Sequence, residues 1–350
     1  MNKKLNEIDE YKPSDRTKKP DVYKLDWNEC NLEFDNEFKQ ILNTCISDVI
    51  LSEYPDIHND LLYSLLADYC GLQDSNIQLF NGSDSALHCI FAALLNYDSK
   101  VLVYHPNYNQ IFSYLKLYSN FVESSEIIDP FYKHEYNFDD IKNFDLIYLS
   151  NPNNPTGKLL EIDKIQSLLE LHNDKYFIID EAYFEFSKES CCHLVKDYKN
   201  LIVTRTFSKG FSLAAIRLGY ICADESVIKL INKIRNTKDV NSFAQALGVC
   251  ALQNKKFIDS RVEVIIENRE RFQKELEING IQFIDSKANF VLIKTDDSKA
   301  LTQKLLDNDI LVRDRGMFKN IENTVRITIG DWQIMEKIIH LIVENNYEHR

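Results

Sequence analysis

Short apolar runs that end in polar residues recur through the middle of the chain, and they constrain its fold more than any other feature. They lie at 77–80, 101–104, 145–150, 176–179 and 201–203. Runs of this length, separated by loops and by segments with helical spacing, predict the buried strands of a parallel sheet. Parallel strands joined by right-handed helical crossovers present their carboxyl ends at one edge of the sheet. We therefore expect the polar residues that follow these runs to share that edge: Ser83, Tyr108, Asn154, Asp180 and Lys209.

The composition is that of a globular protein. The 350 residues are enough for two domains, 44% of them are hydrophobic and 27% are charged, and no apolar run is long enough to span a membrane. The net charge of −13 argues against a nucleic-acid partner. Residues 1–19 lack the apolar centre of a secretory signal. The eight cysteines show neither metal-binding nor disulfide spacing, so we expect no metal site and a reducing cytoplasm.

The segment 204–219 places one lysine, Lys209, among small, apolar and hydroxyl residues directly after a predicted strand. Burial and a nearby cation, Arg217, would lower the pKa of this lysine toward the neutral amine, which attacks an aldehyde to form a Schiff base. The Ser208 hydroxyl and the Arg217 guanidinium offer partners for a phosphate on the same molecule. The alternative interpretation is a strand end followed by an unrelated lysine on a loop.

A phosphate site is also predicted where the run 77–80 ends. Asn81, Gly82, Ser83 and Asp84 follow it and precede a predicted helix at 85–95. A strand, a glycine and a helix start aim backbone N–H groups at an anion, and the helix dipole assists. An ordinary serine or aspartate N-cap is the alternative.

Three further strand ends carry candidate ligand-binding residues. Asp180 follows the run 176–179, and a buried carboxylate needs a cationic partner. Tyr183 comes shortly after it. The loop 151–157 contains two prolines and a glycine, which fix a rigid loop where open α/β sheets bind their ligands. Tyr108 offers a flat aromatic face after the run 101–104.

Several of these segments resemble the motifs of one enzyme family. Residues 206–219 match the pattern T-x-S-K-x-x-x-L-A-x-x-R-x-G, residues 151–157 read N-P-N-N-P-T-G, and 54–56 read Y-P-D. The chain thereby resembles fold-type I pyridoxal-phosphate enzymes, and within them the histidinol-phosphate aminotransferases, from about residue 25 to about residue 330. The motifs are hypotheses that their structural context must support.

The resemblance implies pyridoxal 5'-phosphate as cofactor and assigns roles around it. Lys209 carries the cofactor and shuttles a proton, Asp180 pairs with the ring nitrogen, and Tyr183 acts beside the ring oxygen. Asn154 donates to that oxygen, Tyr108 stacks on the ring, and Tyr54 reaches the phosphate from the other subunit of a homodimer. The remaining residues expected to bind the cofactor surround its phosphate: Gly82, Ser83, Asp84, Thr206, Ser208 and Arg217.

The resemblance also implies two substrate-binding arginines. Arg326, in a V-R-I-T segment, holds a substrate carboxylate, and Arg313 is the second anion-binding residue, although an internal pair with Asp314 is the alternative for Arg313. Asn154 lies beside the substrate as well. Asn28 is assigned to the substrate more weakly, because the family sequence N-E-N-P reads Asn28-Glu29-Cys30-Asn31 here and lacks the proline.

The expected fold is α/β, of the aspartate aminotransferase type. A large domain at 36–255 carries a mostly parallel, doubly wound sheet that binds the cofactor, and residues 1–35 form an N-terminal arm. A long charged helix at 257–279 leads into a smaller α+β domain at 256–350. The strands expected in that domain are 281–283, 288–293, 310–312 and 324–329, and its helices are 299–307 and 332–344.

The predicted activity is pyridoxal-phosphate-dependent transamination between an amino acid donor, glutamate, and an oxo or amine substrate that can be phosphorylated. Decarboxylation of an amino-acid O-phosphate is the alternative, since the two reactions differ in which bond to the α-carbon is broken. A catalytically inactive scaffold or regulator on this fold is the non-enzyme alternative. Neither nucleic acid nor membrane is an expected partner.

Overall fold

The computed structural model describes residues 22–348, and its centre is a seven-stranded sheet with the order β2-β8-β7-β6-β5-β3-β4. The strand β8 is antiparallel to both of its neighbours, and the other neighbouring pairs are parallel. The five predicted strands are all present, and β4 and β8 are additional. The strands are β2 (Ile77–Phe80), β3 (Lys100–His105), β4 (Phe121–Glu126), β5 (Leu146–Ser150), β6 (Tyr176–Asp180), β7 (Leu201–Thr206) and β8 (Gly219–Ala223).

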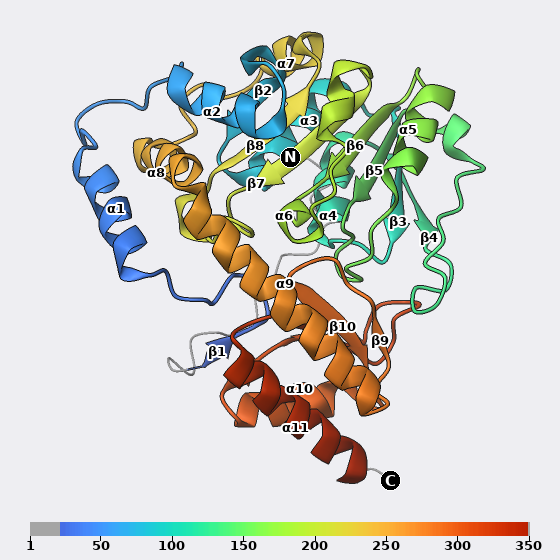
Figure 1. Cartoon of the computed structure of the whole chain (residues 1–350). Coiled ribbons are helices and arrows are strands. Elements are labelled where there is room, and N and C mark those ends of the chain that lie inside the picture. The colour runs from blue at the N-terminus through green and yellow to red at the C-terminus, as the bar shows by residue number, and fades with distance from the viewer. Residues whose placement is uncertain (1–21, 349–350) are drawn as a thin grey trace, which may run out of the picture.

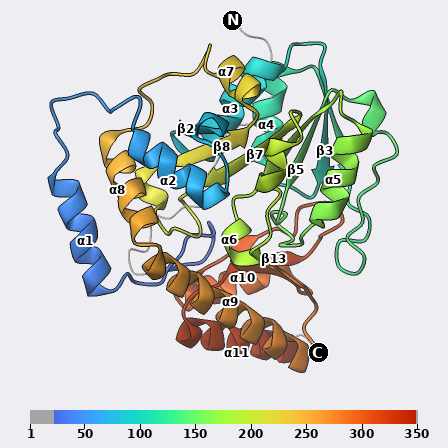
Figure 2. The same ribbon diagram turned by 45° about the horizontal axis from the view of Figure 1, so that its top comes forward.

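Helices cover both faces of this sheet (Figures 1 and 2). One face packs on α3 (Gly82–Leu94), α4 (Gln110–Tyr118) and α7 (Glu225–Ile231), and the other on α2 (Asp60–Cys70), α5 (Ile162–Leu171) and α8 (Ser242–Gln253). Side chains alternate between the faces along each strand. In β7, Ile202 joins the core on the α3 side, whereas Leu201 and Val203 join the core on the α2 side.

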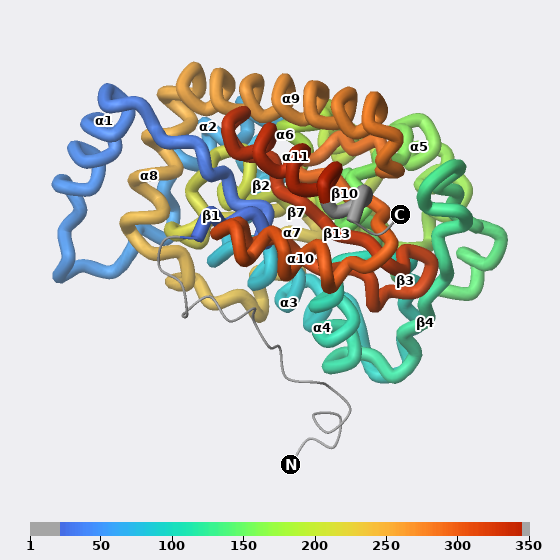
Figure 3. Tube along the Cα trace, turned by 90° about the horizontal axis from the view of Figure 1, so that it is seen from below, coloured from blue at the N-terminus to red at the C-terminus, as the bar shows by residue number. Residues whose placement is uncertain are grey.

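A second, antiparallel sheet lies beyond the long helix α9 (Lys255–Ile278). Its order is β12 (Arg313–Asp314), β13 (Thr324–Thr328), β10 (Phe290–Lys294) and β9 (Phe283–Ile284). The helices α10 (Ser298–Asp307) and α11 (Trp332–Glu348) lie side by side in this part of the chain, as the view from below shows (Figure 3). The mostly parallel α/β class with a smaller α+β part is therefore confirmed.

Three expectations about local structure were wrong. The predicted strand 310–312 is divided: β11 (Ile310–Leu311) pairs in parallel with β1 (Tyr23–Lys24), and only the next residues, β12, join the small sheet. The apolar spacing at 36–50 predicts a helix over that range, but α1 (Asn36–Ser47) is shorter. A helix is likewise expected at 224–235, and α7 covers only part of it. Residues 1–21 of the expected arm lie outside the described residues.

The pairing of β1 explains the divided strand. After β1, Leu25 donates its N–H to Leu311 and accepts from the N–H of Thr328. Residues near the start of the chain thus pair with strands of the C-terminal part. A local apolar pattern does not reveal such a pairing between distant segments. Within the part of the chain that is described, no helix has both the length and the apolar character needed to cross a membrane.

Candidate active site

Lys209 follows β7, and its amine points toward the segment after β1. The Nζ atom donates to the Trp27 carbonyl at 2.7 Å. Burial lowers the pKa of Lys209 to about 8, with a further contribution from the charge of Arg326. Arg217, the cation expected from the sequence, lowers this pKa too, but contributes less than Arg326. About a tenth of the amine is therefore neutral at pH 7 before anything binds.

Two glycines bring an anion-binding helix end against Arg217. Gly82 begins α3 with φ +79°, and a Cβ there would lie 2.6 Å from the guanidinium of Arg217. A Cβ on Gly219 in β8 would lie 2.6 Å from the backbone nitrogen of Ser83. Any side chain at either position would push the helix end or the guanidinium away. Glycine is therefore needed for the backbone N–H groups of Gly82–Asp84 and the Arg217 side chain to converge.

Hydroxyl groups complete this cradle for an anion. Arg217 donates from NH1 to Ser208 Oγ at 3.2 Å, and its NH2 lies 3.9 Å from Asp84 Oδ2. Thr206 Oγ1 accepts the backbone N–H of Ser208 at 3.1 Å and lies 3.0 Å from Ser208 Oγ. Thr206 thus holds Ser208 toward Arg217, and the donor set of N–H, O–H and guanidinium suits a phosphate.

Asp180, at the end of β6, is a buried carboxylate. It accepts a hydrogen bond from the Tyr148 hydroxyl at 2.7 Å and one from the backbone N–H of Ala182 at 3.3 Å. Burial raises the pKa of Asp180 to about 6, even though the Tyr148 hydrogen bond lowers it. A cation placed beside this carboxylate would lower its pKa again, so the site favours a protonated ring nitrogen.

The Tyr183 hydroxyl lies between two amides. It accepts from Asn28 Nδ2 at 2.9 Å and from Asn154 Nδ2 at 3.3 Å. Because both amides act as donors, the hydroxyl can give its own proton to an oxygen of a bound group. Tyr108, after β3, is half-buried, and its hydroxyl lies 3.4 Å from Asp84 Oδ1. The residue expected to stack on the cofactor ring therefore lies next to the anion cradle.

The two substrate-binding candidates stand opposite each other in the small sheet. Arg313 in β12 is the cross-strand partner of Arg326 in β13, so their side chains share one face. Arg326 is buried and donates to Asn154 Oδ1 at 2.7 Å and to the Asp26 carbonyl at 2.6 Å. Its guanidinium therefore joins the small sheet to the loop 151–157. Asp314 accepts instead from the backbone N–H of Gly316 at 2.8 Å.

Tyr54 is the candidate that the fold does not bring to this site. It lies on the loop between α1 and α2 and is 78% exposed. Its ring packs under Lys238, whose Nζ is 4.0 Å from the ring centre.

Glu181, beside Asp180 in sequence, faces the opposite side of the sheet and pairs with Arg205 at 2.9 Å.

Sequence reasoning missed three contributors to the site. The run 145–150 identifies Tyr148 only as part of a buried strand, and the carbonyl groups of Trp27 and Asp26 are not among the predicted site residues. A tyrosine inside the otherwise apolar β5 is a signal for Tyr148, because a buried hydroxyl needs a partner. The two carbonyl groups carry no sequence signal, since every residue has one.

Together these groups fit pyridoxal 5'-phosphate. The cradle supplies donors for its phosphate, Asp180 a partner for its ring nitrogen, and Tyr183 and Asn154 donors for its ring oxygen. The Nζ atom of Lys209 lies 6.0 Å from the centre of the Tyr183 ring. A sequence profile of aminotransferase class I and II matches residues 20–342. The chain belongs to this family. It is a pyridoxal-phosphate-dependent aminotransferase, and the cofactor implied by the sequence motifs is confirmed.

Known members of the family align along nearly the whole chain. Histidinol-phosphate aminotransferase of Thermoanaerobacter pseudethanolicus is 34% identical over 335 residues, which are 93% of each protein. Dihydroxyacetone phosphate transaminase of Campylobacter jejuni is 35% identical over 334 residues, 92% of this chain and 90% of the relative.

A solved structure confirms the expected aspartate aminotransferase type of fold. Histidinol-phosphate aminotransferase of Sinorhizobium meliloti, in complex with pyridoxal-5'-phosphate, superimposes with a TM-score of 0.87 over 98% of this chain and 96% of its own, at 20% identity. At that identity the likeness concerns the fold.

Proposed function

We propose that this aminotransferase moves an amino group between glutamate and a small phosphorylated compound. The two relatives are named for histidinol phosphate and for dihydroxyacetone phosphate. In both compounds a phosphate ester sits on the carbon next to the one that holds the nitrogen or the carbonyl oxygen. That shared feature, rather than an imidazole or a hydroxymethyl group, defines the proposed substrate class.

The observation that carries this proposal is the pairing of Arg313 with Arg326 across β12 and β13. In a chain of net charge −13, a bulk field does not attract anions, so recognition must come from local pairing. Two guanidinium groups on one face suit a dianionic phosphate, or the two carboxylates of glutamate, in the alternating half-reactions of an aminotransferase. Arg326 is held by Asn154 and Asp26 and keeps its position for either ligand.

We assign the chemistry around the cofactor as follows. Bound pyridoxal phosphate supplies an electron sink for the bond that breaks at the substrate carbon. Lys209 holds the cofactor and then moves the proton, for which a pKa of about 8 is close to the operating pH. Asp180 keeps the ring nitrogen protonated, and Tyr183 with Asn154 binds the ring oxygen. Gly82, Ser83, Asp84, Thr206, Ser208 and Arg217 hold the phosphate, and Tyr108 stacks on the ring.

A homodimer in which Tyr54 completes the partner's site is part of this proposal. The loop that carries Tyr54 and its flanking helices expose several large apolar side chains, namely Ile46, Ile50, Leu51, Ile57 and Leu61. An apolar surface of this kind suits a protein contact.

We also propose the division into an arm at 1–35 and domains at 36–255 and 256–350, which agrees with the two separate sheets. The eight free cysteines support a cytoplasmic location.

The test is product analysis with nitrogen-15 glutamate. The purified enzyme is incubated with oxo compounds that have or lack a phosphate on the neighbouring carbon, and the products are identified by mass spectrometry. We expect labelled phosphorylated amines together with 2-oxoglutarate. Carbon dioxide release from amino-acid O-phosphates without a new oxo acid would establish a decarboxylase instead. Turnover of unphosphorylated compounds alone would refute the substrate class, and Lys209→Ala serves as the inactive control.

A further inference from the structure

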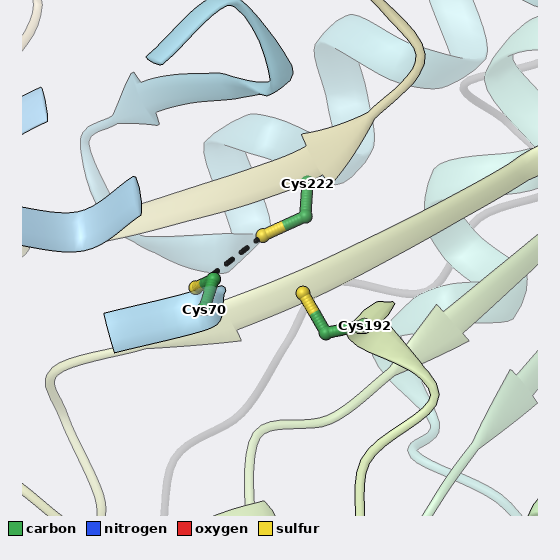
Figure 4. Close-up of side chains that lie close together, drawn as sticks. All are labelled: Cys70, Cys192 and Cys222. Atoms are coloured by element: carbon green, nitrogen blue, oxygen red, sulfur yellow. Dashed lines mark hydrogen bonds between the residues drawn. The ribbon is translucent and has the colours of Figure 1, made fainter. Parts of the chain in front are cut away.

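Three cysteines that are far apart in sequence meet on the face of the large sheet away from the anion cradle. Cys70 ends α2, Cys192 begins a short 3₁₀ helix (Cys192–Lys196), and Cys222 lies in β8. Their sulfur atoms all lie within 4.8 Å of one another, and Figure 4 shows the three side chains close together, with the contact between Cys222 and Cys70 dashed. The expectation that the chain has no metal site depends on the spacing of cysteines along the sequence. That spacing does not reveal a cluster formed by packing.

The distances suit a metal bound by thiolates. Zn²⁺ binds cysteine sulfur at about 2.3 Å, so two sulfurs around one tetrahedral ion lie about 3.8 Å apart. In the structure Cys70 and Cys222 are separated by 3.8 Å between their sulfur atoms. Cys192 and Cys222 are buried and Cys70 is half-buried, so the cluster has one side through which an ion can enter.

A buried cation, the guanidinium of Arg205, lies beside the cluster. Arg205 NH1 lies 3.6 Å from the Cys70 sulfur, and the Arg205 guanidinium is held in place by Glu181. The Tyr220 hydroxyl lies 3.8 Å from the same sulfur and offers an oxygen as a fourth ligand.

We propose that Cys70, Cys192 and Cys222 form a binding site for a thiophilic d¹⁰ cation, Zn²⁺ or Cu⁺. Soft thiolate ligands select these ions. On binding, each thiol that becomes a ligand loses its proton to solvent and forms one sulfur–metal bond, with no change of oxidation state. Three thiolates around Zn²⁺ leave one negative charge, which lies next to Arg205. The ion would link α2 to β8. It would thereby stabilise the packing of α2 on the large sheet, which also carries the segment 204–219 with Lys209.

The experiment measures metal binding by the reduced holoenzyme. Zn²⁺ is titrated against a chromogenic chelator, and Cu⁺ is titrated anaerobically against a Cu⁺-specific chelator. We expect one equivalent of one of the two ions, and the titration that shows it identifies the ion. Cys192→Ala should weaken this binding by on the order of a hundredfold or more, since changing even an outer-shell group weakens metal sites by up to that factor.

Cys191→Ala is the matched control, because Cys191 is the neighbouring buried cysteine and lies outside the cluster. It should keep native binding, and the metal should raise the melting temperature of the native protein and of this control alone. If Cys192→Ala does not fold, Cys70→Ala tests the same point at the half-buried position. Absence of stoichiometric binding of both ions, or equal binding by all variants, would overturn the proposal. Oxidation of the cluster to a disulfide without metal uptake would overturn it too.

Discussion

Tyr148→Phe isolates one hydrogen bond that sets the charge of Asp180. The Tyr148 hydroxyl donates to Asp180 Oδ2 at 2.7 Å, and both side chains are buried. The substitution removes an oxygen atom and leaves the ring in the same space. A hydrogen bond to a charged group contributes about 1.5–3 kcal/mol, which equals about 1–2 pKa units. The pKa of Asp180 in the cofactor-free protein, about 6, should therefore rise.

The consequence is a pH-dependent loss of cofactor affinity. With the pKa raised by 1–2 units, the ionised fraction of Asp180 at pH 7 falls from about nine-tenths to between about a half and a tenth. Since only the carboxylate pairs with a protonated ring nitrogen, pyridoxal phosphate should bind the variant roughly two- to tenfold more weakly at pH 7. Near pH 9 Asp180 is ionised in both proteins, and the difference should largely disappear.

The assay is titration of the cofactor-free protein with pyridoxal phosphate between pH 5 and 9, followed by absorbance. Tyr104→Phe is the control, because Tyr104 is also a buried tyrosine of the same sheet and its hydroxyl donates to the Asn137 carbonyl at 2.7 Å. The control should follow the native curve. Superposition of the Tyr148→Phe curve on that of Tyr104→Phe would refute the reasoning.

Three further predictions test other parts of the site. Arg313→Ala should weaken phosphorylated substrates by about 1.5–3 kcal/mol while affecting glutamate much less; equal losses in kcat/KM for both would make Arg313 structural. Mixing Tyr54→Phe subunits with Lys209→Ala subunits puts both lesions in one site of a dimer, so hybrids should exceed the Lys209→Ala homodimer in activity, and a monomer in sedimentation would end this idea. Burial raises the Asp180 pKa from 3.8 to about 6, so its charge destabilises the cofactor-free protein by up to about 3 kcal/mol above pH 6 and by nothing below about pH 4. The cofactor-free Asp180→Asn variant should therefore have a higher melting temperature than the native protein at pH 8 and the same melting temperature at pH 4. Its kcat with cofactor should fall by a factor on the order of 10²–10³. An unimpaired rate would show that Asp180 is not part of the site.

Much of the site could be predicted because its residues follow buried strands. An apolar run with a polar end is a local pattern, and the parallel topology then brings the ends together. Asp180 at the end of β6 and Lys209 after β7 are predicted in this way. Two strands of the small sheet also have local patterns, since β10 is an apolar run that ends in a lysine and β13 alternates polar and apolar residues.

The rest depends on contacts between distant segments. The pairing of β1 with β11 could not be predicted, because Tyr23–Lys24 has no strand pattern of its own. Tyr148 reaches Asp180 through the register of two strands, and a shift by one residue would point it to the other face. Arg326 outweighs Arg217 at Lys209, and its contact with Asn154 of the loop 151–157 joins residues far apart in the sequence. Similarly, the three cysteines share a site through packing alone.

The most direct test of the account is to identify the lysine that holds the cofactor. Borohydride reduction of the holoenzyme converts the bond between lysine and pyridoxal phosphate into a stable amine, and peptide mapping by mass spectrometry then locates the added mass. We predict one modified residue, Lys209, and no modification of the Lys209→Ala variant under the same conditions. Modification of any other lysine in the native enzyme would contradict the assignment of the site.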